Sequence, residues 1–276
     1  MLKRIITAAI GLVLLVIVLI FSDTLVFPTV CCALTLIGVY EMLGCIRVRK
    51  NLVTSILMYI VTVAAFVLSQ LKLSLSVFIC TYASMLFILL IVLFAMSVFS
   101  EGHLPVDKVC IAFTIVAYII TGLISLVLLR NIEYGVYLYL IPFVGPWVSD
   151  TFAYFGGRLF GRHKLIPSVS PKKTVEGAVC GVVFCTAVCS DYGIVIRNYS
   201  GINYPVWAFI VMGAIVAVVS QVGDLIFSLI KRRYNVKDYG MILPGHGGVL
   251  DRFDSVISTA PLLFIVCEAL IVFKLI

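Results

Sequence analysis

Long apolar runs separated by short polar breaks make up most of this chain. Most runs are close in length to the roughly 20 residues with which an α-helix crosses a bilayer. When the runs are read against prolines, glycines and charges, they predict nine membrane-spanning helices, at residues 5–22, 25–45, 52–70, 74–99, 109–129, 134–157, 175–195, 204–230 and 252–274. The pattern therefore predicts an all-α, polytopic integral membrane protein with short loops.

The composition agrees with a membrane protein. Of the 276 residues, 63% are apolar and only 12% are charged, whereas soluble domains carry about 25% charged residues. Nine spans leave almost no residues for a separate domain outside the membrane. The chain divides by polarity, because the first five spans, in residues 1–130, hold few charges, while the polar segments collect in residues 131–276.

The distribution of basic residues predicts the orientation. If the N-terminus is cytoplasmic, sixteen of the twenty Lys and Arg residues fall in cytoplasmic loops, and the other four are Lys72, Arg130, Arg197 and Lys274. Because Lys and Arg collect in cytoplasmic loops, the chain is expected to have an odd number of spans and its C-terminus outside. Topology thus explains most of the net charge of +7, which gives no reason to expect a nucleic acid as partner.

An aspartate is predicted inside the sixth span, just after Pro142 and Pro146 interrupt it. Helical spacing places five side chains on one face of this segment, namely Trp147, Asp150, Thr151, Tyr154 and Arg158. A carboxylate within a membrane is costly unless it has a partner, so Asp150 is a candidate functional residue. The alternative is a structural role, in which Asp150 pairs with Arg158 or with a backbone amide.

The next loop is basic and glycine-rich, and its end is a predicted phosphate-binding site. The candidate residues are Ser170, Lys172, Lys173, Thr174 and Glu176. Ser170 is expected to cap a helix that begins at Pro171, and the amides and dipole at such a start favour a phosphate. The lysines would add positive charge, and Glu176 would complete the cap or bind a hydroxyl or amino group of the ligand. The alternative is a loop that contacts anionic lipid headgroups.

Carboxylates collect around the last two spans. The eighth span carries a polar stripe made of Ser220, Gln221, Asp224, Ser228 and Lys231. Asp251 and Asp254 share a face at the start of the ninth, and the glycines of the intervening GHGG segment at 245–248 would let the loop fold until the three aspartates meet. Oxygen ligands of this kind suit Mg²⁺, which is commonly shared with substrate phosphates. A lysine beside each acid could instead neutralise it without a metal.

Further polar residues surround these acids. The candidates are Lys231, Arg232, Lys237, Asp238, His246, Gly247, Gly248 and Arg252. His246 stands alone between glycines, with no second histidine nearby, so it is expected to donate a hydrogen bond to a phosphate or to organise the loop rather than to bind zinc.

Residues 228–254 resemble the full signature of the phosphatidate cytidylyltransferase family, also called CDP-diacylglycerol synthases. The matching positions are Ser228, Lys231, Arg232, Lys237, Asp238, Gly240, Pro244, His246, Gly247, Gly248, Asp251, Arg252 and Asp254. The segment DTFAYFGGRLFGRHKL, followed by SPKKTVEG, is similar to a second region shared by the family. The resemblance covers about residues 146–255, and the N-terminal half matches only in having several apolar spans.

The resemblance implies a reaction in which CMP is transferred from CTP to phosphatidic acid, giving CDP-diacylglycerol and pyrophosphate. The predicted topology places this site at the cytoplasmic face, within residues 131–276, and residues 1–130 are expected to form a lipid-facing scaffold. Compact size without a long polar N-terminal extension suggests a bacterial inner (plasma) membrane. The resemblance further implies Mg²⁺ or another divalent cation, a role for a monovalent cation such as K⁺, and a homodimer.

For that reaction, the predicted metal ligands are Asp224, Asp251 and Asp254. The residues expected to hold the nucleotide phosphates are Ser170, Lys172, Lys173 and Thr174. Those expected to hold the lipid phosphate or pyrophosphate are Lys231, Arg232 and Arg252. Asp150 and Glu176 would orient the nucleotide or bind the second cation. The other predicted substrate contacts are Lys237, Asp238, His246, Gly247 and Gly248.

Two other functions fit part of the pattern. A CDP-alcohol phosphatidyltransferase also brings clustered aspartates to a nucleotide lipid, but its DGxxAR and GxxxDxxxD motif is missing from the chain. An ion-coupled transporter would line a path with Asp150, Asp224, Asp251 and Asp254. Transport predicts charges near the bilayer midplane, whereas all four lie within about two turns of predicted cytoplasmic ends. Their position favours chemistry at the membrane surface.

Overall fold

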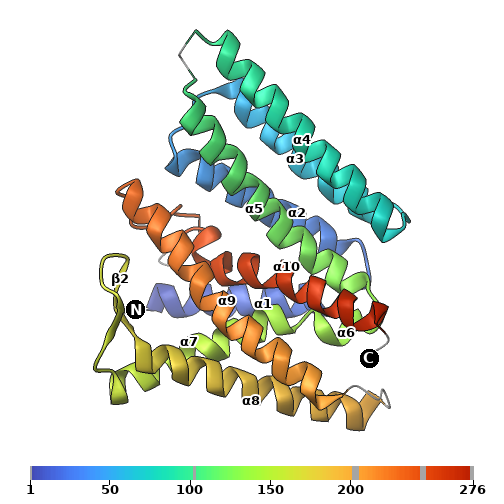
Figure 1. Cartoon of the computed structure of the whole chain (residues 1–276), viewed down its shortest axis with the longest axis vertical. Helices are drawn as coiled ribbons and strands as arrows, with labels where there is room; N and C mark the ends of the chain where they lie inside the picture. Colours follow the sequence, from blue (N-terminus) through green and yellow to red (C-terminus); the bar gives the residue numbers. More distant parts are fainter. Residues whose placement is uncertain (1, 102–103, 201–204, 243–246, 274–276) are drawn as a thin grey trace. The chain divides into compact units, whose positions relative to one another are not determined.

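The computed structural model describes residues 2–101, 104–200, 205–242 and 247–273. Figure 1 labels its elements, which are α1 (Leu2–Ile20), α2 (Val26–Cys45), α3 (Leu52–Gln70), α4 (Leu75–Phe99), α5 (Val106–Asn131), α6 (Gly135–Leu138), α7 (Ile141–Phe160), β1 (Lys164–Ile166), β2 (Ser170–Thr174), α8 (Val175–Ser200), α9 (Val206–Arg233) and α10 (Leu250–Val272). The chain forms two compact units. The first comprises Met1–Val127 and Tyr234–Arg252, and the second Leu128–Arg233 and Phe253–Ile276.

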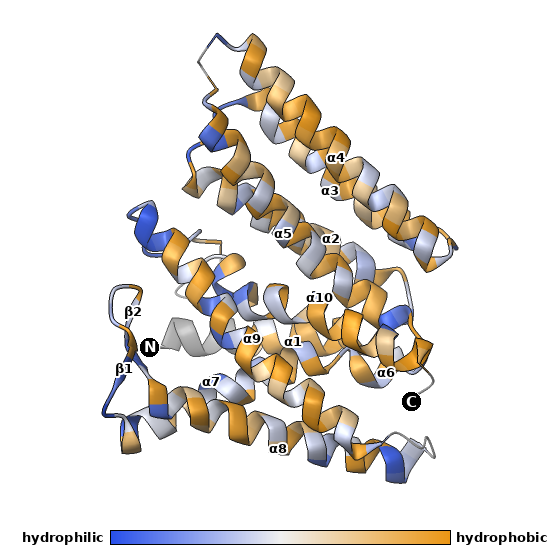
Figure 2. Cartoon of the chain, in the orientation of Figure 1, coloured by the Kyte–Doolittle hydropathy of each residue, from blue (hydrophilic) through white to orange (hydrophobic). Residues whose placement is uncertain are grey.

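The helices confirm an all-α, polytopic membrane protein. Seven helices of the described chain are long and apolar enough to cross a bilayer: α2, α3, α4, α5, α8, α9 and α10. The apolar stretch Ala9–Ile20 of α1 is shorter than a full span, and α7 is less apolar. Figure 2 shows the contrast between the orange spans and the hydrophilic C-terminal end of α9. The count of nine spans and the sides of the two termini stay predictions.

The sixth predicted span, residues 134–157, is wrong as a single helix. The structure divides it into the short α6 and the longer α7, joined through Tyr139 and Leu140. Pro142 lies in the first turn of α7, where its missing N–H costs nothing, whereas it would break a helix that continued through it. Pro146 is accommodated inside α7.

The predicted helix start at Ser170 and Pro171 is also wrong. Ser170–Thr174 forms β2, which pairs antiparallel with β1, and α8 begins five residues later at Val175. Thr174 is the better cap, because its Oγ1 accepts a hydrogen bond from the Gly177 amide at 3.2 Å. Pro171 is tolerated because it lies in a two-stranded hairpin, where every strand is an edge.

In the first unit, α2 packs on α3 and α3 on α4. The hydroxyls of Tyr82 and Thr121 link α4 to α5 at 2.9 Å. On α2, a Cβ added to Gly38 would lie 3.0 Å from Leu250 and 3.5 Å from Ile119, so this glycine lets α2 pack closely on α5 and on the start of α10.

In the second unit, α7, α8 and α9 pack closely on one another, and the hairpin contacts α7 and α8. Glycines set the spacing of α7 and α8. A Cβ added to Gly156 would lie 2.5 Å from the Cβ of Cys180, and one added to Gly177 would lie 2.5 Å from the Ala153 carbonyl oxygen. The close approach fixes α7 against the start of α8 and the hairpin that precedes it.

Candidate active site

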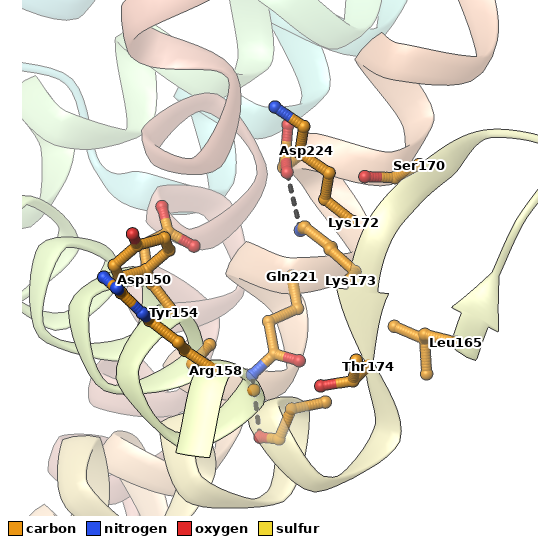
Figure 3. Close-up of a pocket in the computed structure, with 13 residues that line it drawn as sticks. Asp150, Tyr154, Arg158, Leu165, Ser170, Lys172, Lys173, Thr174, Gln221 and Asp224 are labelled. Carbon is orange, nitrogen blue, oxygen red and sulfur yellow. Dashed lines mark hydrogen bonds and ion pairs between the residues drawn. The ribbon is translucent and has the colours of Figure 1, made fainter. Parts of the chain in front are cut away.

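A cavity of about 430 Å³ opens in the second unit between α7, the hairpin, α8 and α9. It is within the size range of small-molecule sites. The lining residues are Asp150, Ala153, Tyr154, Gly157, Arg158, Leu165, Ser170, Lys172, Lys173, Thr174, Ala178, Gln221 and Asp224. Figure 3 shows the labelled side chains, which come from α7, the hairpin and α9.

One face of α7 contributes Asp150, Tyr154 and Arg158 to this cavity. These three residues are four apart, and Figure 3 shows them on the same side of the helix. The predicted polar face is therefore confirmed for these positions. Trp147 and Thr151 are not among the lining residues, and the Thr151 hydroxyl instead donates to the Trp147 carbonyl at 2.7 Å.

Lys173 of β2 pairs with Asp224 of α9 inside the cavity. The Lys173 Nζ and Asp224 Oδ2 atoms are 2.5 Å apart, and each side chain is only a quarter to a third exposed. Apart from this ion pair, the buried ammonium has no hydrogen-bond partner of good geometry among the described residues. An ammonium carries three donors, so Lys173 retains capacity for an acceptor that enters the cavity.

The predicted phosphate-binding residues of the hairpin do meet in the cavity, although not at a helix start. Ser170, Lys172, Lys173 and Thr174 all line it. Because they lie on a strand, they would meet an anion with their side chains instead of a row of helix amides.

Glu176, by contrast, lies outside this cavity. Both of its carboxylate oxygens accept the His163 amide at 3.2 Å, and Oε1 lies 2.6 Å from His163 Nδ1. His163 precedes β1, so this contact closes the base of the hairpin. The sequence did not single out His163, because its partner follows only after the hairpin has turned back.

Gln221 is a lining residue that belonged to the predicted polar stripe but not to the predicted site. It is buried, and its Nε2 donates to the Ser149 hydroxyl at 3.2 Å and to the Ala178 carbonyl at 3.1 Å. Gln221 thus ties α9 to both α7 and α8 at the cavity floor.

Asp254 is a third carboxylate near Asp150 and Asp224 in the second unit. It is half-buried, its Oδ1 accepts the Ser255 amide at 2.7 Å, and it interacts electrostatically with Asp224, Asp150 and Lys231. Across the described residues, no group of three or more His, Cys, Asp or Glu side chains is close enough to form a ready metal site.

The second basic residue of the signature reaches the hairpin. Arg232, in the last turn of α9, donates from Nε to the Val169 carbonyl at 3.4 Å. This contact joins the end of α9 to the turn between β1 and β2, and leaves the two terminal nitrogens of the guanidinium on an exposed side chain.

The loop between α9 and α10 and the start of α10 belong to the first unit, where Asp251 holds the loop together. Its Oδ2 accepts the Tyr239 amide at 2.8 Å and the Gly248 amide at 3.0 Å. Gly247 has a φ of 83°, in the region that favours glycine. Lys237, Asp238 and Arg252 are exposed around this loop. His246 lies outside the described residues.

Glu41 of α2 is the partner of this loop that sequence reasoning missed. It is 3% exposed, and its two carboxylate oxygens accept the Val249 and Leu250 amides, each at 3.0 Å. A Cβ added to Gly248 would lie 2.5 Å from both Glu41 oxygens, and one on Gly240 would also clash with Oε1. The glycines of the signature are therefore needed to admit Glu41.

Comparison with known proteins supports the family resemblance. The model of the cytidylyltransferase family matches residues 2–270, which is nearly the whole chain. The chain belongs to the cytidylyltransferase family.

Similar members of the family carry a common name. A phosphatidate cytidylyltransferase of Rickettsia felis is 36% identical over 231 residues, which are 79% of this chain and 93% of that protein. One from Staphylococcus saprophyticus is 38% identical over 172 residues, 62% of this chain and 64% of the relative. The chain thus spans slightly less than two thirds of the length of the staphylococcal relative. The family match to residues 2–270 shows that the similarity extends well beyond residues 146–255, to which the sequence analysis had limited it.

Proposed function

We propose that this chain is a phosphatidate cytidylyltransferase that transfers CMP from CTP to phosphatidic acid, forming CDP-diacylglycerol and pyrophosphate. The observation that carries the proposal is the cavity of the second unit, where Lys172, Lys173 and Arg158 face Asp150 and Asp224. A basic cavity that also holds carboxylates suits a nucleoside triphosphate with a divalent cation. The family membership and the names of the relatives agree with it.

The reaction does not need a strong general base. The attacking oxygen of phosphatidic acid is ionised near neutral pH, so the protein must chiefly position two anions in line and neutralise charge at the α-phosphate of CTP. Lys173 is suited to this because its ammonium is desolvated and held in place by Asp224. Lys172 and Ser170, on the same strand, would hold the other phosphates of the nucleotide.

The carboxylates of the second unit fit a hard divalent cation. Asp224 and Asp254 offer oxygen ligands within electrostatic range of each other, and Mg²⁺ is usually held by one or two carboxylates together with substrate phosphates. A preformed group of three ligands is therefore not required. When bound, the ion would supply charge stabilisation at the phosphates. Asp251 remains a proposed third ligand, although its Oδ2 already accepts two backbone amides.

The remaining roles follow from charge and location. We assign the lipid phosphate or pyrophosphate to Lys231, Arg232 and Arg252. Asp150 would orient the nucleotide or bind a monovalent cation such as K⁺. The site would face the cytoplasm at a bacterial plasma membrane, and the enzyme would act as a homodimer. The hydrogen bonds of Glu176 favour a hairpin-closing role over substrate contact.

A product assay tests the proposal. Purified protein supplied with radiolabelled CTP, phosphatidic acid and Mg²⁺ should form a labelled product that extracts into organic solvent. Chelation with EDTA should abolish its formation, and added Mg²⁺ should restore it. Asp224→Asn should reduce turnover by about 100-fold or more, while the variant keeps the wild-type melting profile. No lipid-extractable label from wild-type protein would overturn the proposal and favour the transporter alternative.

A further inference from the structure

An apolar groove runs along the surface of the first unit between α2 and α3. Leu36 and Ile37 line it from α2, and Ile60, Val63 and Val67 from α3. Its cavity volume is about 810 Å³, and its wall is almost entirely apolar. From Tyr59 to Val67 the groove follows α3 for about 12 Å, at 1.5 Å per residue. A groove of this kind on two membrane spans fits a hydrocarbon chain.

The groove ends at a polar group. Tyr40 of α2 and Tyr59 of α3 line its end, and the guanidinium carbon of Arg49 stacks 4.4 Å from the centroid of the Tyr40 ring. Tyr59 lies within electrostatic range of Arg49 and Tyr40. Among the described residues no carboxylate forms an ion pair with Arg49. Two phenols and an exposed guanidinium thus supply donors where the apolar wall stops.

Tyr40 connects the groove to a second cavity. This cavity of about 570 Å³ is lined by Tyr40 and Arg49 together with Asp238, Tyr239 and Gly240 of the signature loop. Its carboxylates are Asp238 and Glu41, and Glu41 already accepts the Val249 and Leu250 amides, so an anion would be held at the Arg49 end and not beside the loop. Arg47 and Lys50, in the same turn as Arg49, add to the positive charge there.

We propose that this groove holds the lipid substrate before the reaction, with one acyl chain of phosphatidic acid between α2 and α3 and its phosphate on Arg49, from which the phosphate would pass to the basic residues assigned above. The proposal rests on the proposed function for the identity of the lipid. The positive charge of Arg49 favours an anionic head group. Arg49 also lines a cavity together with the signature loop, which favours a lipid that must reach that loop. A guanidinium can bind a phosphate through two parallel hydrogen bonds, and the phosphate monoester of phosphatidic acid carries more negative charge near neutral pH than a phosphodiester head group.

Photolabelling tests the site without relying on catalysis. Purified protein in detergent micelles is labelled with phosphatidic acid that carries a diazirine on one acyl chain, and the labelled peptides are mapped by mass spectrometry. Label is expected in α2 and α3, and excess phosphatidic acid should displace it at least ten times better than phosphatidylglycerol. Equal displacement by both lipids would mean a general anionic-lipid surface and overturn the proposal, as would label spread evenly over α4.

Matched variants test the two halves of the groove. Val63→Trp should fill the apolar part and lower labelling several-fold, whereas Ile91→Trp, on the exposed surface of α4, should not. Arg49→Gln should raise the KM for phosphatidic acid about tenfold without changing the KM for CTP, and Lys72→Gln, at an exposed lysine after the end of α3, should change neither. Unchanged labelling in Val63→Trp overturns the groove, and an unchanged lipid KM in Arg49→Gln overturns the phosphate contact. If wild-type protein forms no lipid product, the proposed function fails, while the labelling still decides whether the groove binds the lipid.

Discussion

At the scale of single residues, the Lys173–Asp224 pair is the most informative contact in the second unit. The sequence left two interpretations of Asp224, as a metal ligand or as the partner of a lysine. The structure contains the ion pair, yet the two interpretations are compatible, because a lysine that neutralises an acid in the cavity can bind phosphates once a cation takes its place beside that acid. The two interpretations predict different losses of activity when Lys173 and Asp224 are substituted one at a time.

A double-mutant cycle separates these interpretations. Lys173→Ala and Asp224→Asn should each lower kcat/KM for CTP, and the double variant should lose less than the product of the two effects, with a coupling of about 1 kcal/mol. Asp224→Asn should be the more damaging, since it also removes a proposed metal ligand. Lys172→Ala, which lines the same cavity, serves as the control and should not couple to Asp224. Fully additive effects at Lys173 and Asp224 would contradict the pair's role in catalysis.

Glu41 leads to a prediction about stability. Glu41→Gln keeps the size of the side chain but turns one amide acceptor into a donor, so the Val249 or Leu250 amide loses its partner. The free energy of unfolding should fall by about 1–3 kcal/mol, measured as a lower thermal transition in detergent. Glu268→Gln, at a half-buried acid of α10, is the control and should change it little. An unchanged transition in Glu41→Gln would show that the loop is held by other contacts.

At the scale of elements, the site depends on how closely α7 approaches α8. Gly156 leaves room for Cys180, and α7 carries Asp150, Tyr154 and Arg158 on the side that lines the cavity. A displacement of α7 would therefore move these three side chains together, so the spacing of α7 and α8 should affect the proposed nucleotide binding.

Gly156→Ala tests this spacing. The added methyl group would meet the Cβ of Cys180, so the variant should lose about 1–3 kcal/mol of stability and its KM for CTP should rise several-fold. Combining it with Cys180→Gly removes the clash and should recover much of the CTP binding. Gly11→Ala, where nothing lies within 4 Å of the added Cβ, is expected to change neither the stability nor the KM for CTP. A normal CTP KM in Gly156→Ala would mean that the cavity tolerates movement of α7.

The elements also show what sequence reasoning could reach. Helix boundaries such as 52–70 are confirmed residue for residue, because the length of an apolar run is local information. The hairpin was missed because SPKKT contains both a good cap and a proline, and only pairing with Lys164–Ile166 decides between strand and helix. Glu41 was missed because its partners are backbone amides, which leave no mark in the sequence.

At the scale of the whole molecule, topology is the open prediction. The seven long apolar spans and the nine predicted ones are both odd numbers, so either count puts the termini on opposite sides. Only if just one of α1 and α7 crosses the membrane would the termini share a side.

Reporter fusions test this orientation in a bacterial host. Alkaline phosphatase fused after α10 should be active, because it folds only outside the cytoplasm, and a green fluorescent protein at the same position should stay dark. The same pair of reporters placed in the loop between α9 and α10 should give the opposite result. Fluorescence after α10 would contradict the predicted topology and point to an even number of spans.

The bond between Glu41 and the start of α10 has a consequence for how the protein is made. Glu41 lies 208 residues before Val249 and 209 residues before Leu250 in the chain. While the chain is being synthesised, α2 enters the membrane long before Val249 and Leu250 leave the ribosome. The Glu41 carboxylate can accept their amides only after these residues have emerged. The signature loop can reach its final form only after the last helix has been translated. A nascent chain that stalls before α10 would therefore contain every residue that lines the cavity but could not close the signature loop.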